Sequence, residues 1–235
     1  MYTECLNFLR TDNLQHLKLS CHLKFEHSIS MLDAVKKILL NAPRLETLHL
    51  SNIPISIQEI NKISTLKSLR IDMNNFFDRP VKKFNFSNLE SIHLTIFPDA
   101  NDEFIKRIVK DCKKLCNVEI FVCNLVTMKG LIPITKLPGL RHFGASEVND
   151  EVFDKLSHLE TFCCPTLNLS RNNMKARVFN FFRRSPNLKS THVCIGDDYG
   201  LFDEYAREYG IILNRDGKYY RSCFCGIDWK KQFNN

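Results

Sequence analysis

Apolar and polar residues follow two different periods along this chain, and the two periods succeed each other repeatedly. Residues 31–40 have the spacing of an amphipathic helix, with lysines off its apolar face. The apolar residues of that helix are Leu32, Val35, Ile38 and Leu39. Pro43 must end the helix, because proline cannot continue it and disfavours the helical conformation in the residue before it. From Leu45 the period changes to two, so residues 45–50 (LETLHL) predict a strand.

The same strand pattern, L-x-x-L-x-L with substitutions, recurs eight times at intervals of 19 to 31 residues. The copies begin at Leu14, Leu45, Leu66, Leu89, Leu115, Leu140, Leu159 and Leu188. The last three copies are weaker, because they contain Gly144, Cys163 and Thr191. A single helix–strand unit has too little apolar surface to be stable alone, whereas stacked units bury a continuous core. The pattern therefore predicts an α/β solenoid with a layer of parallel strands and a layer of helices.

The intervals between the strands contain helical patterns and breaks. The expected helices span residues 31–40, 56–64, 103–112, 151–156 and 175–184. Asp102 and either Asn149 or Asp150 are the expected caps of two of them. The remaining connections lack a helical period and are expected to be an insertion at 20–30, an irregular segment at 74–88 and a loose turn at 129–138.

The repeats run through the chain without a linker, so we expect one domain over residues 1–235. Residues 1–13 resemble half a repeat or an N-terminal cap, and residues 14–196 hold the repeats. Residues 197–235 are interpreted as a C-terminal cap. It contains an expected helix (201–209), a stop at Gly210, a last strand (211–213) and a hairpin at Asp216-Gly217, which precedes an aromatic-rich end.

Composition indicates a globular chain, since 44% of residues are hydrophobic and 25% are charged. Residues 1–13 lack the basic and apolar segments of a signal peptide, and no apolar run has membrane-spanning length. We expect a cytoplasmic or nuclear protein. The ten cysteines are expected to be reduced, and the glycosylation patterns at Asn85 and Asn168 to be chance matches. Cys223 and Cys225 lack a second close pair, so no zinc site is expected.

Helix, small residue and L-x-x-L-x-L together resemble the leucine-rich repeats of F-box proteins. The small residue stands three positions before the first leucine as Ala42, Cys112 and Ser185, which resembles the ribonuclease-inhibitor-like, cysteine-containing type. Asn74 and Cys123 match the position that follows the strand in that family. The resemblance covers roughly residues 2–196. It implies a horseshoe of about eight to nine repeats, with the parallel sheet on the concave face and helices and loops on the convex face.

The resemblance also implies a function. The chain is similar to the substrate-recognition domain of F-box, leucine-rich-repeat ubiquitin-ligase receptors, a protein–protein interaction module. No F-box precedes Leu14, so binding to a Skp-type adaptor would need an F-box outside this chain. The alternative is a stand-alone or secreted leucine-rich repeat protein, a scaffold or decoy with no role in ubiquitin ligation.

Alternate strand positions give the candidate partner-binding residues, because they point away from the apolar side. These residues are His16, Lys18, His49, Arg70, Asp72, His93, Glu119, Phe121, His142 and His192. Parallel strands lie ~4.8 Å apart, so His49, Arg70 and His93 should form a row of donors. That row could bind an acidic partner, more strongly as histidines protonate below pH ~6.5. In the simpler interpretation, these residues occupy a solvated face of the sheet.

Net charge is +7, and basic residues are concentrated between Arg171 and Lys189. This segment could contact an acidic partner or nucleic acid, but it is also typical of a solvated outer helix face. Nucleic acid and membranes are not expected as partners. The chain has no phosphate-binding glycine loop and no H-E-x-x-H or G-x-S-x-G motif. We therefore expect no enzyme, no cofactor and no metal, with His49 and His93 lacking a third ligand.

Overall fold

The computed structural model describes residues 11–21, 25–72, 83–98, 100–193, 199–210 and 212–214. These residues form an α/β fold built on a nine-stranded sheet. Its strands are β1 (His16–Ser20), β2 (Thr47–Ser51), β3 (Ser68–Asp72), β4 (Ser91–Thr95), β5 (Asn117–Phe121), β6 (His142–Ala145), β8 (Thr161–Cys164), β10 (Ser190–Val193) and β11 (Ile212–Asn214). Each of the eight predicted strand patterns supplies one of the first eight of these strands.

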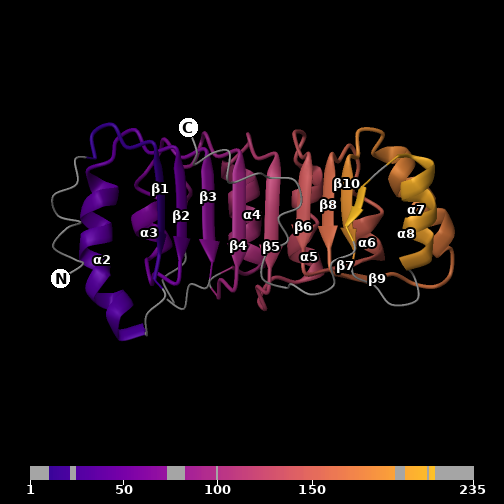
Figure 1. The fold of residues 1–235 in the computed structure, drawn as a ribbon, viewed down its shortest axis with the longest axis horizontal. Coiled ribbons are helices and arrows are strands. Elements are labelled where there is room, and N and C mark those ends of the chain that lie inside the picture. Colours follow the sequence, from indigo (N-terminus) through magenta and orange to yellow (C-terminus); the bar gives the residue numbers. More distant parts are fainter. Residues whose placement is uncertain are drawn as a thin grey trace.

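Strand order in this sheet follows the order of the chain, and each pair is parallel. The strands stand side by side along the long axis of the molecule (Figure 1). The register keeps equivalent repeat positions level, so Leu48 pairs with Leu69 and Leu69 with Ile92. The predicted α/β class and parallel sheet are therefore confirmed.

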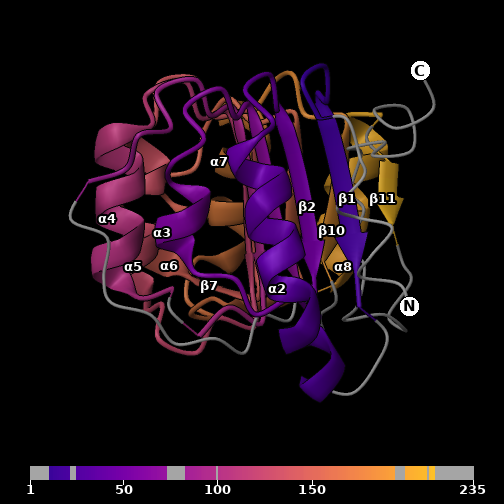
Figure 2. The same cartoon turned by 90° about the vertical axis from the view of Figure 1, so that its left-hand side faces the viewer.

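Most helices lie on one side of the sheet, to the left in Figure 2, and the helix nearest the C-terminal end lies beside the last strands. The helices are α2 (Phe25–Leu40), α3 (Ile57–Ile60), α4 (Asp102–Asp111), α5 (Met128–Leu131), the 3₁₀ turn η1 (Ile134–Lys136), α6 (Asp150–Phe153), α7 (Met174–Arg184) and α8 (Tyr199–Glu208). Two expectations were wrong. Residues 25–30, expected in an insertion, form the start of α2, and two short helical turns replace the loose turn expected at 129–138.

The leucines of the repeat lie in the core between these two layers. Leu45, Leu48, Leu66, Leu69 and Leu89 are fully buried, with 0% of their surface exposed. They belong to one continuous cluster of buried side chains that extends from Leu17 to Ala206. In the last repeats phenylalanines replace leucines, and their rings pack edge-to-face or stacked, as between Phe153 and Phe181. Each repeat thus buries its apolar positions against the next one.

An Asn-Asp pair begins two of the helices and links each helix to the following repeat. Asn101 and Asn149 are the N-caps, and their side chains accept hydrogen bonds from Phe104 N and Val152 N. The cap predicted at Asp102 is therefore one residue off. Asp102 instead accepts hydrogen bonds of 2.7 Å from both the backbone N–H and the hydroxyl of Thr127, which begins α5. Asp150 binds Ser170 in the same way.

The chain leaves the sheet in a left-handed backbone conformation after several strands. Asn52, Ile96 and Val122 directly follow β2, β4 and β5, with φ of 53°, 51° and 53°. The Ile96 N–H donates to Phe121 O at 3.0 Å, so the ladder of parallel hydrogen bonds extends one residue beyond β4. Asparagine tolerates this conformation, whereas it is strained in the β-branched Ile96 and Val122.

Two short strands were not predicted: β7 (Glu147–Asn149) and β9 (Thr166–Asn168) form a separate parallel pair beside the helices. Towards the C-terminal end, α8 packs against α7, Gly210 adopts φ of 65° and β11 extends the sheet. These features match the helix, stop and strand expected at 201–213. The predicted hairpin at Asp216-Gly217, Cys223, Cys225, Asn74 and residues 1–10 lie outside the described residues.

Candidate functional site

The side of the sheet opposite the helices carries the predicted partner-binding residues, and we call it the polar face. It is formed by the first, third and fifth residues of β1 to β5 and by the first and third residues of β6, β8 and β10. Register aligns the third residues in one row, in which His49 lies next to Arg70 and Arg70 next to His93. The row continues through Glu119 to Gly144. The structure therefore brings the predicted His49–Arg70–His93 row together.

The predicted residues differ strongly in exposure. His16 and Lys18 on β1 are exposed, and Asp72 is partly exposed. The other predicted residues are at most 8% exposed: His49, Arg70, His93, Glu119, Phe121, His142 and His192. The interpretation of this side as a solvated face is therefore wrong for strands β2 to β10. Charges at this depth need partners, because burying an unpaired ion is costly.

Asp72 is the acceptor at one end of a network of charged groups. Its Oδ2 accepts hydrogen bonds from His49 Nε2 at 2.9 Å and from Arg70 Nε at 2.7 Å. Its Oδ1 lies 3.4 Å from His93 Nε2. Burial raises the pKa of Asp72, but the hydrogen bonds from His49 and His93 and the charge of Arg70 outweigh it and hold the pKa well below its ordinary value. Asp72 is therefore a carboxylate.

Glu119 is the second acceptor and joins three strands. One carboxylate oxygen binds His93 Nδ1, and the other lies 2.5 Å from His142 Nε2. The other ring nitrogen of His142 contacts the hydroxyl of Thr161 on β8. Burial raises the pKa of Glu119, but the hydrogen bonds from His142 and His93 prevail and lower it to about 2. The network thus extends from β2 to β8.

His93 lies between the two carboxylates. Burial lowers the pKa of its imidazole, but the hydrogen bonds to Asp72 and Glu119 outweigh burial and raise it. With His93 protonated, Arg70 and His93 supply two positive charges that balance those of Asp72 and Glu119. The donors predicted to bind an acidic partner are therefore already bound to acids of the chain itself.

Thr95, His93 and Glu119 have the connectivity of a catalytic triad. Thr95 Oγ1 lies 2.8 Å from His93 Nε2, while His93 Nδ1 binds Glu119. In such a triad the imidazole must be neutral to take the proton of the hydroxyl. The two carboxylates favour the imidazolium instead, so His93 is poorly suited as a base. Thr95 and Thr161 are network partners whose hydroxyl contacts the sequence pattern did not reveal.

Cysteines and metal ligands give no second site in the described part of the chain. Cys21, Cys112, Cys116, Cys123 and Cys164 are free thiols, and burial raises the pKa of Cys112 to about 12 and of Cys123 to about 11. The thiols of Cys112 and Cys123 are therefore poor nucleophiles near neutral pH. Cys163 is disulfide-bonded, so the expectation of reduced cysteines is wrong at this position. No group of three metal-binding side chains occurs within the described ranges.

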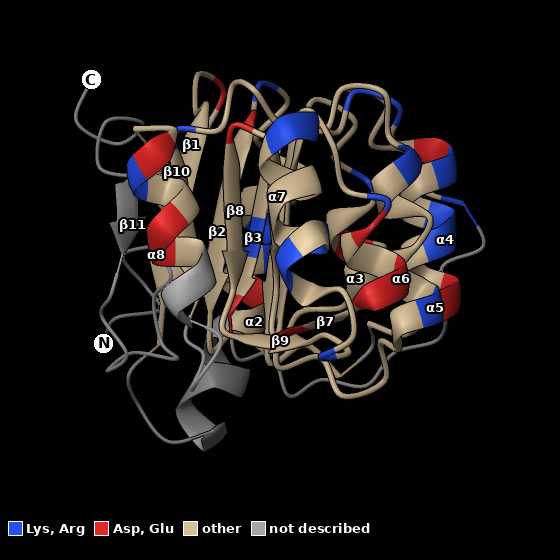
Figure 3. Ribbon diagram, turned by 90° about the vertical axis from the view of Figure 1, so that its right-hand side faces the viewer, with Lys and Arg blue, Asp and Glu red and all other residues tan. Residues whose placement is uncertain are grey.

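The basic segment between Arg171 and Lys189 lies on the outer helix layer, where acidic residues accompany it (Figure 3). Arg177 forms ion pairs with Asp150 and Asp154, and Lys189 with Glu160 at 2.6 Å. Arg184 donates hydrogen bonds to backbone carbonyls. Half of the six basic residues are thus engaged within the fold, which favours the solvated helix face over a nucleic-acid site.

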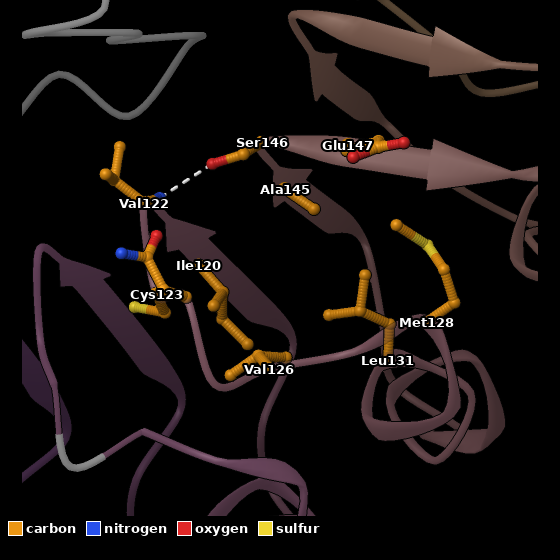
Figure 4. A pocket seen from close by; sticks show the side chains of 10 residues that line it. Ile120, Val122, Cys123, Val126, Met128, Leu131, Ala145, Ser146 and Glu147 are labelled. Carbon is orange, nitrogen blue, oxygen red and sulfur yellow. Dashed lines mark hydrogen bonds between the residues drawn. The ribbon is translucent and has the colours of Figure 1, made fainter.

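A further region, which the sequence pattern missed, lies at the edge of the sheet where β4 and β5 end. We call it the rim, defined by Ile96, Val122 and Leu125, apolar residues that are 40%, 39% and 57% exposed. Beside Val122 a cavity of about 230 Å³ opens between the ends of β5 and β6 and α5 (Figure 4). Its lining includes Val126, Met128, Leu131, Ala145, Ser146 and Glu147. One sequence signal could have revealed the rim. Ile96 and Val122 are apolar and β-branched, yet they follow their strands at the position that Asn52 occupies after β2.

Comparisons with known proteins show a similar fold and give no information on function. No protein-family model matches the chain, and no curated protein matches it. A solved structure of a Bacteroides fragilis protein, determined by a structural genomics consortium, is similar, with a TM-score of 0.63 at 16% identity. The match covers 91% of this chain and 69% of that chain. At this identity the likeness concerns the fold. No helix in the described ranges is both long and apolar enough to span a bilayer.

Proposed function

We propose that the chain is a leucine-rich repeat horseshoe that binds a protein partner, similar to the substrate-recognition domain of an F-box ubiquitin-ligase receptor. One observation carries the proposal: in the described part of the chain, parallel strands repeat in register on one sheet, with α2 to α7 on one side of it. Such solenoids present extended surfaces instead of a single deep site. The balanced and buried network of the polar face stiffens this surface, and the exposed apolar residues of the rim are available for contact.

A photo-cross-linking amino acid at three positions tests the proposal. Lys18 lies on the polar face, Asn124 near the rim, and Lys106 on the outer side of α4, which serves as the control. A partner protein should form adducts with positions 18 or 124 and not with 106, and should bind again after purification. Adducts from position 106 alone, or from none of the three, would contradict a binding role of the sheet side.

The link to ubiquitin ligation needs a separate experiment. The complete natural protein should retain a Skp-type adaptor in a pull-down with purified components if an F-box accompanies this domain. If the adaptor is not retained, the chain is a binding module outside the ligase machinery.

The disulfide at Cys163 favours a second candidate, a secreted scaffold or decoy of the same fold. Disulfides persist mainly in oxidising compartments. Mass spectrometry of the protein from its native source separates the two candidates. Glycans at Asn85 or Asn168 with an oxidised Cys163 support the secreted candidate, whereas a reduced Cys163 without glycans supports the intracellular one.

A further inference from the structure

Two residues of the rim have a strained backbone and an exposed apolar side chain. Ile96 and Val122 have left-handed backbone conformations, in which the branched Cβ approaches the backbone closely. Both side chains also expose about two fifths of their surface to water. Asn52 occupies the equivalent position after β2, so the repeat can be built with a residue that tolerates this conformation. Strain retained at an exposed position indicates a role outside folding.

The rim is continuous with a cavity of matching character. Val122 lines both, and its N–H donates a hydrogen bond of 2.7 Å to Ser146 Oγ, which holds the two strand ends together. The side chains of Ile120, Val126, Leu131 and Met128 surround the hollow, with Ile120 on the left and Met128 on the right in Figure 4. At about 230 Å³ the cavity can accept one leucine- or methionine-sized side chain, and the flexible Met128 can adapt its shape.

The negative charge of Glu147 at the cavity indicates which kind of residue should lie next to the inserted side chain. Ten of the described residues line the cavity, and Glu147 is the charged one among these ten, although the chain as a whole carries +7. Glu147 accepts a hydrogen bond of 3.2 Å from Asn168, which leaves its negative charge uncompensated by that neutral partner. A basic group beside the apolar side chain would therefore complement the site.

We propose that the rim and its cavity are a docking site for a protein partner that inserts a leucine- or methionine-sized side chain next to a basic residue. This inference rests on the proposed binding function and places the contact at the edge of the sheet, where β4 and β5 end. The strain at Ile96 and Val122 is then the cost of displaying apolar side chains towards the partner.

Capped dipeptides test the site without knowledge of the natural partner. The probes are acetyl-leucyl-lysine amide, acetyl-leucyl-glutamate amide and acetyl-seryl-lysine amide, and the readout is the methyl NMR signals of Val122, Met128 and Leu131. The leucyl-lysine probe should shift these signals at about 20 mM, a concentration suited to so small a ligand. It should bind about threefold more tightly than the leucyl-glutamate probe. The seryl probe should not bind.

Three variants separate docking from folding. Val122→Asn relieves strain, so its melting temperature should stay equal or rise, while affinity for the leucyl-lysine probe falls about fivefold. Glu147→Gln should remove the preference for lysine over glutamate and leave leucine binding intact. Leu40→Asn replaces an apolar residue that is 63% exposed on α2, remote from the rim, and should change neither affinity nor preference.

No methyl shift with either leucyl probe, equal shifts with the seryl probe, or unchanged binding in a folded Val122→Asn variant would overturn the docking site. A cross-linked partner that still binds Val122→Asn would overturn the rim as its contact but preserve the proposed binding function. Absence of any partner adduct would count against the function itself.

Discussion

Gly144 lies in the middle row of the polar face, where a larger residue has no room. A Cβ at this position would lie 3.0 Å from both Glu119 Cγ and the Phe121 ring. Gly144→Ala must displace buried side chains and should lower the free energy of unfolding by about 1–3 kcal/mol. Gly139→Ala is the matched control, because its Cβ would meet only Leu115 O at 3.8 Å. Urea denaturation of both variants measures the difference, and equal losses would contradict the packing described.

Glu119 ties stability to pH. A carboxylate with a lowered pKa stabilises the fold above its ordinary pKa, and that contribution is lost as the pH falls from about 4.3 towards 2. Glu119→Gln should therefore cost about 3–5 kcal/mol at pH 7, because His93 loses an anionic partner. The difference from the wild type should shrink as the pH approaches 2. Denaturation at several pH values tests this, with the exposed Glu151→Gln as the control; a difference independent of pH would contradict it.

The contribution of His93 to stability depends on pH in the opposite direction from that of Glu119. Its raised pKa means that the imidazolium stabilises the fold below the ordinary histidine pKa of about 6.5, and that this contribution is lost as the pH rises through the raised value. His93→Gln should therefore be less stable than the wild type at neutral pH, with the gap closing at alkaline pH. Free energies of unfolding at neutral and at alkaline pH measure this difference; a gap that widens with pH would reverse the assignment.

At the scale of residues, the hydrophobic pattern predicted where the polar side chains lie on the sheet but not which of them form hydrogen bonds with one another. Period-two alternation and the repeat placed His49, Arg70 and His93 level with one another. It did not reveal that Asp72 and Glu119 would bind them, since pairing depends on side-chain reach across strands. Nor did it reveal burial, which depends on the packing of the whole face. Ile96 and Val122 were passed over because a single left-handed residue after a strand leaves no periodic signal.

At the scale of elements, Asp102 fastens α4 to the start of α5 through both of its oxygens. Asp102→Ala leaves the N–H and hydroxyl of Thr127 without this partner and should cost about 0.5–2 kcal/mol, as for loss of a helix cap. Glu103→Ala, in the same turn of α4, removes an exposed pair with Lys106, which solvent screens, and should therefore change the stability much less than Asp102→Ala. Thermal unfolding compares the two; the reverse order would show that the link between the helices is not stabilising.

Strands were predicted better than helices, for a physical reason. Each strand has buried leucines at fixed offsets, and a change of register by one residue would turn them away from the core. Three of the described helices, α3, α5 and α6, have only four residues. The ends of the helices depend on caps and on neighbours from the next repeat, such as Asp102 with Thr127. The turns of α5 and η1 form despite Gly130 and Pro133, because packing and not propensity determines them.

At the scale of the whole molecule, neighbouring repeats support one another. Leu48 is fully buried between β2 and the helix layer, so Leu48→Ala should cost about 2–5 kcal/mol. The loss should spread to the adjoining repeats, with faster amide exchange in β1 and β3 before β8. Leu40→Ala, on an exposed site of α2, is the control and should change little. Uniform acceleration across the sheet would indicate one cooperative unit instead of coupled repeats.

Sequential strand order has a mechanical consequence. Each strand pairs with the ones that precede and follow it in the sheet. Among the residues that the structure describes, β1 and β11 are therefore the outermost strands, and each pairs with one other strand. When the two ends are pulled apart, the hydrogen bonds of the outermost strand pair break first. Each interior strand stays paired on both sides until its neighbour has detached. An optical trap should therefore record a staircase of small extensions at modest force, repeat by repeat from the ends, and reversal on relaxation should retrace it.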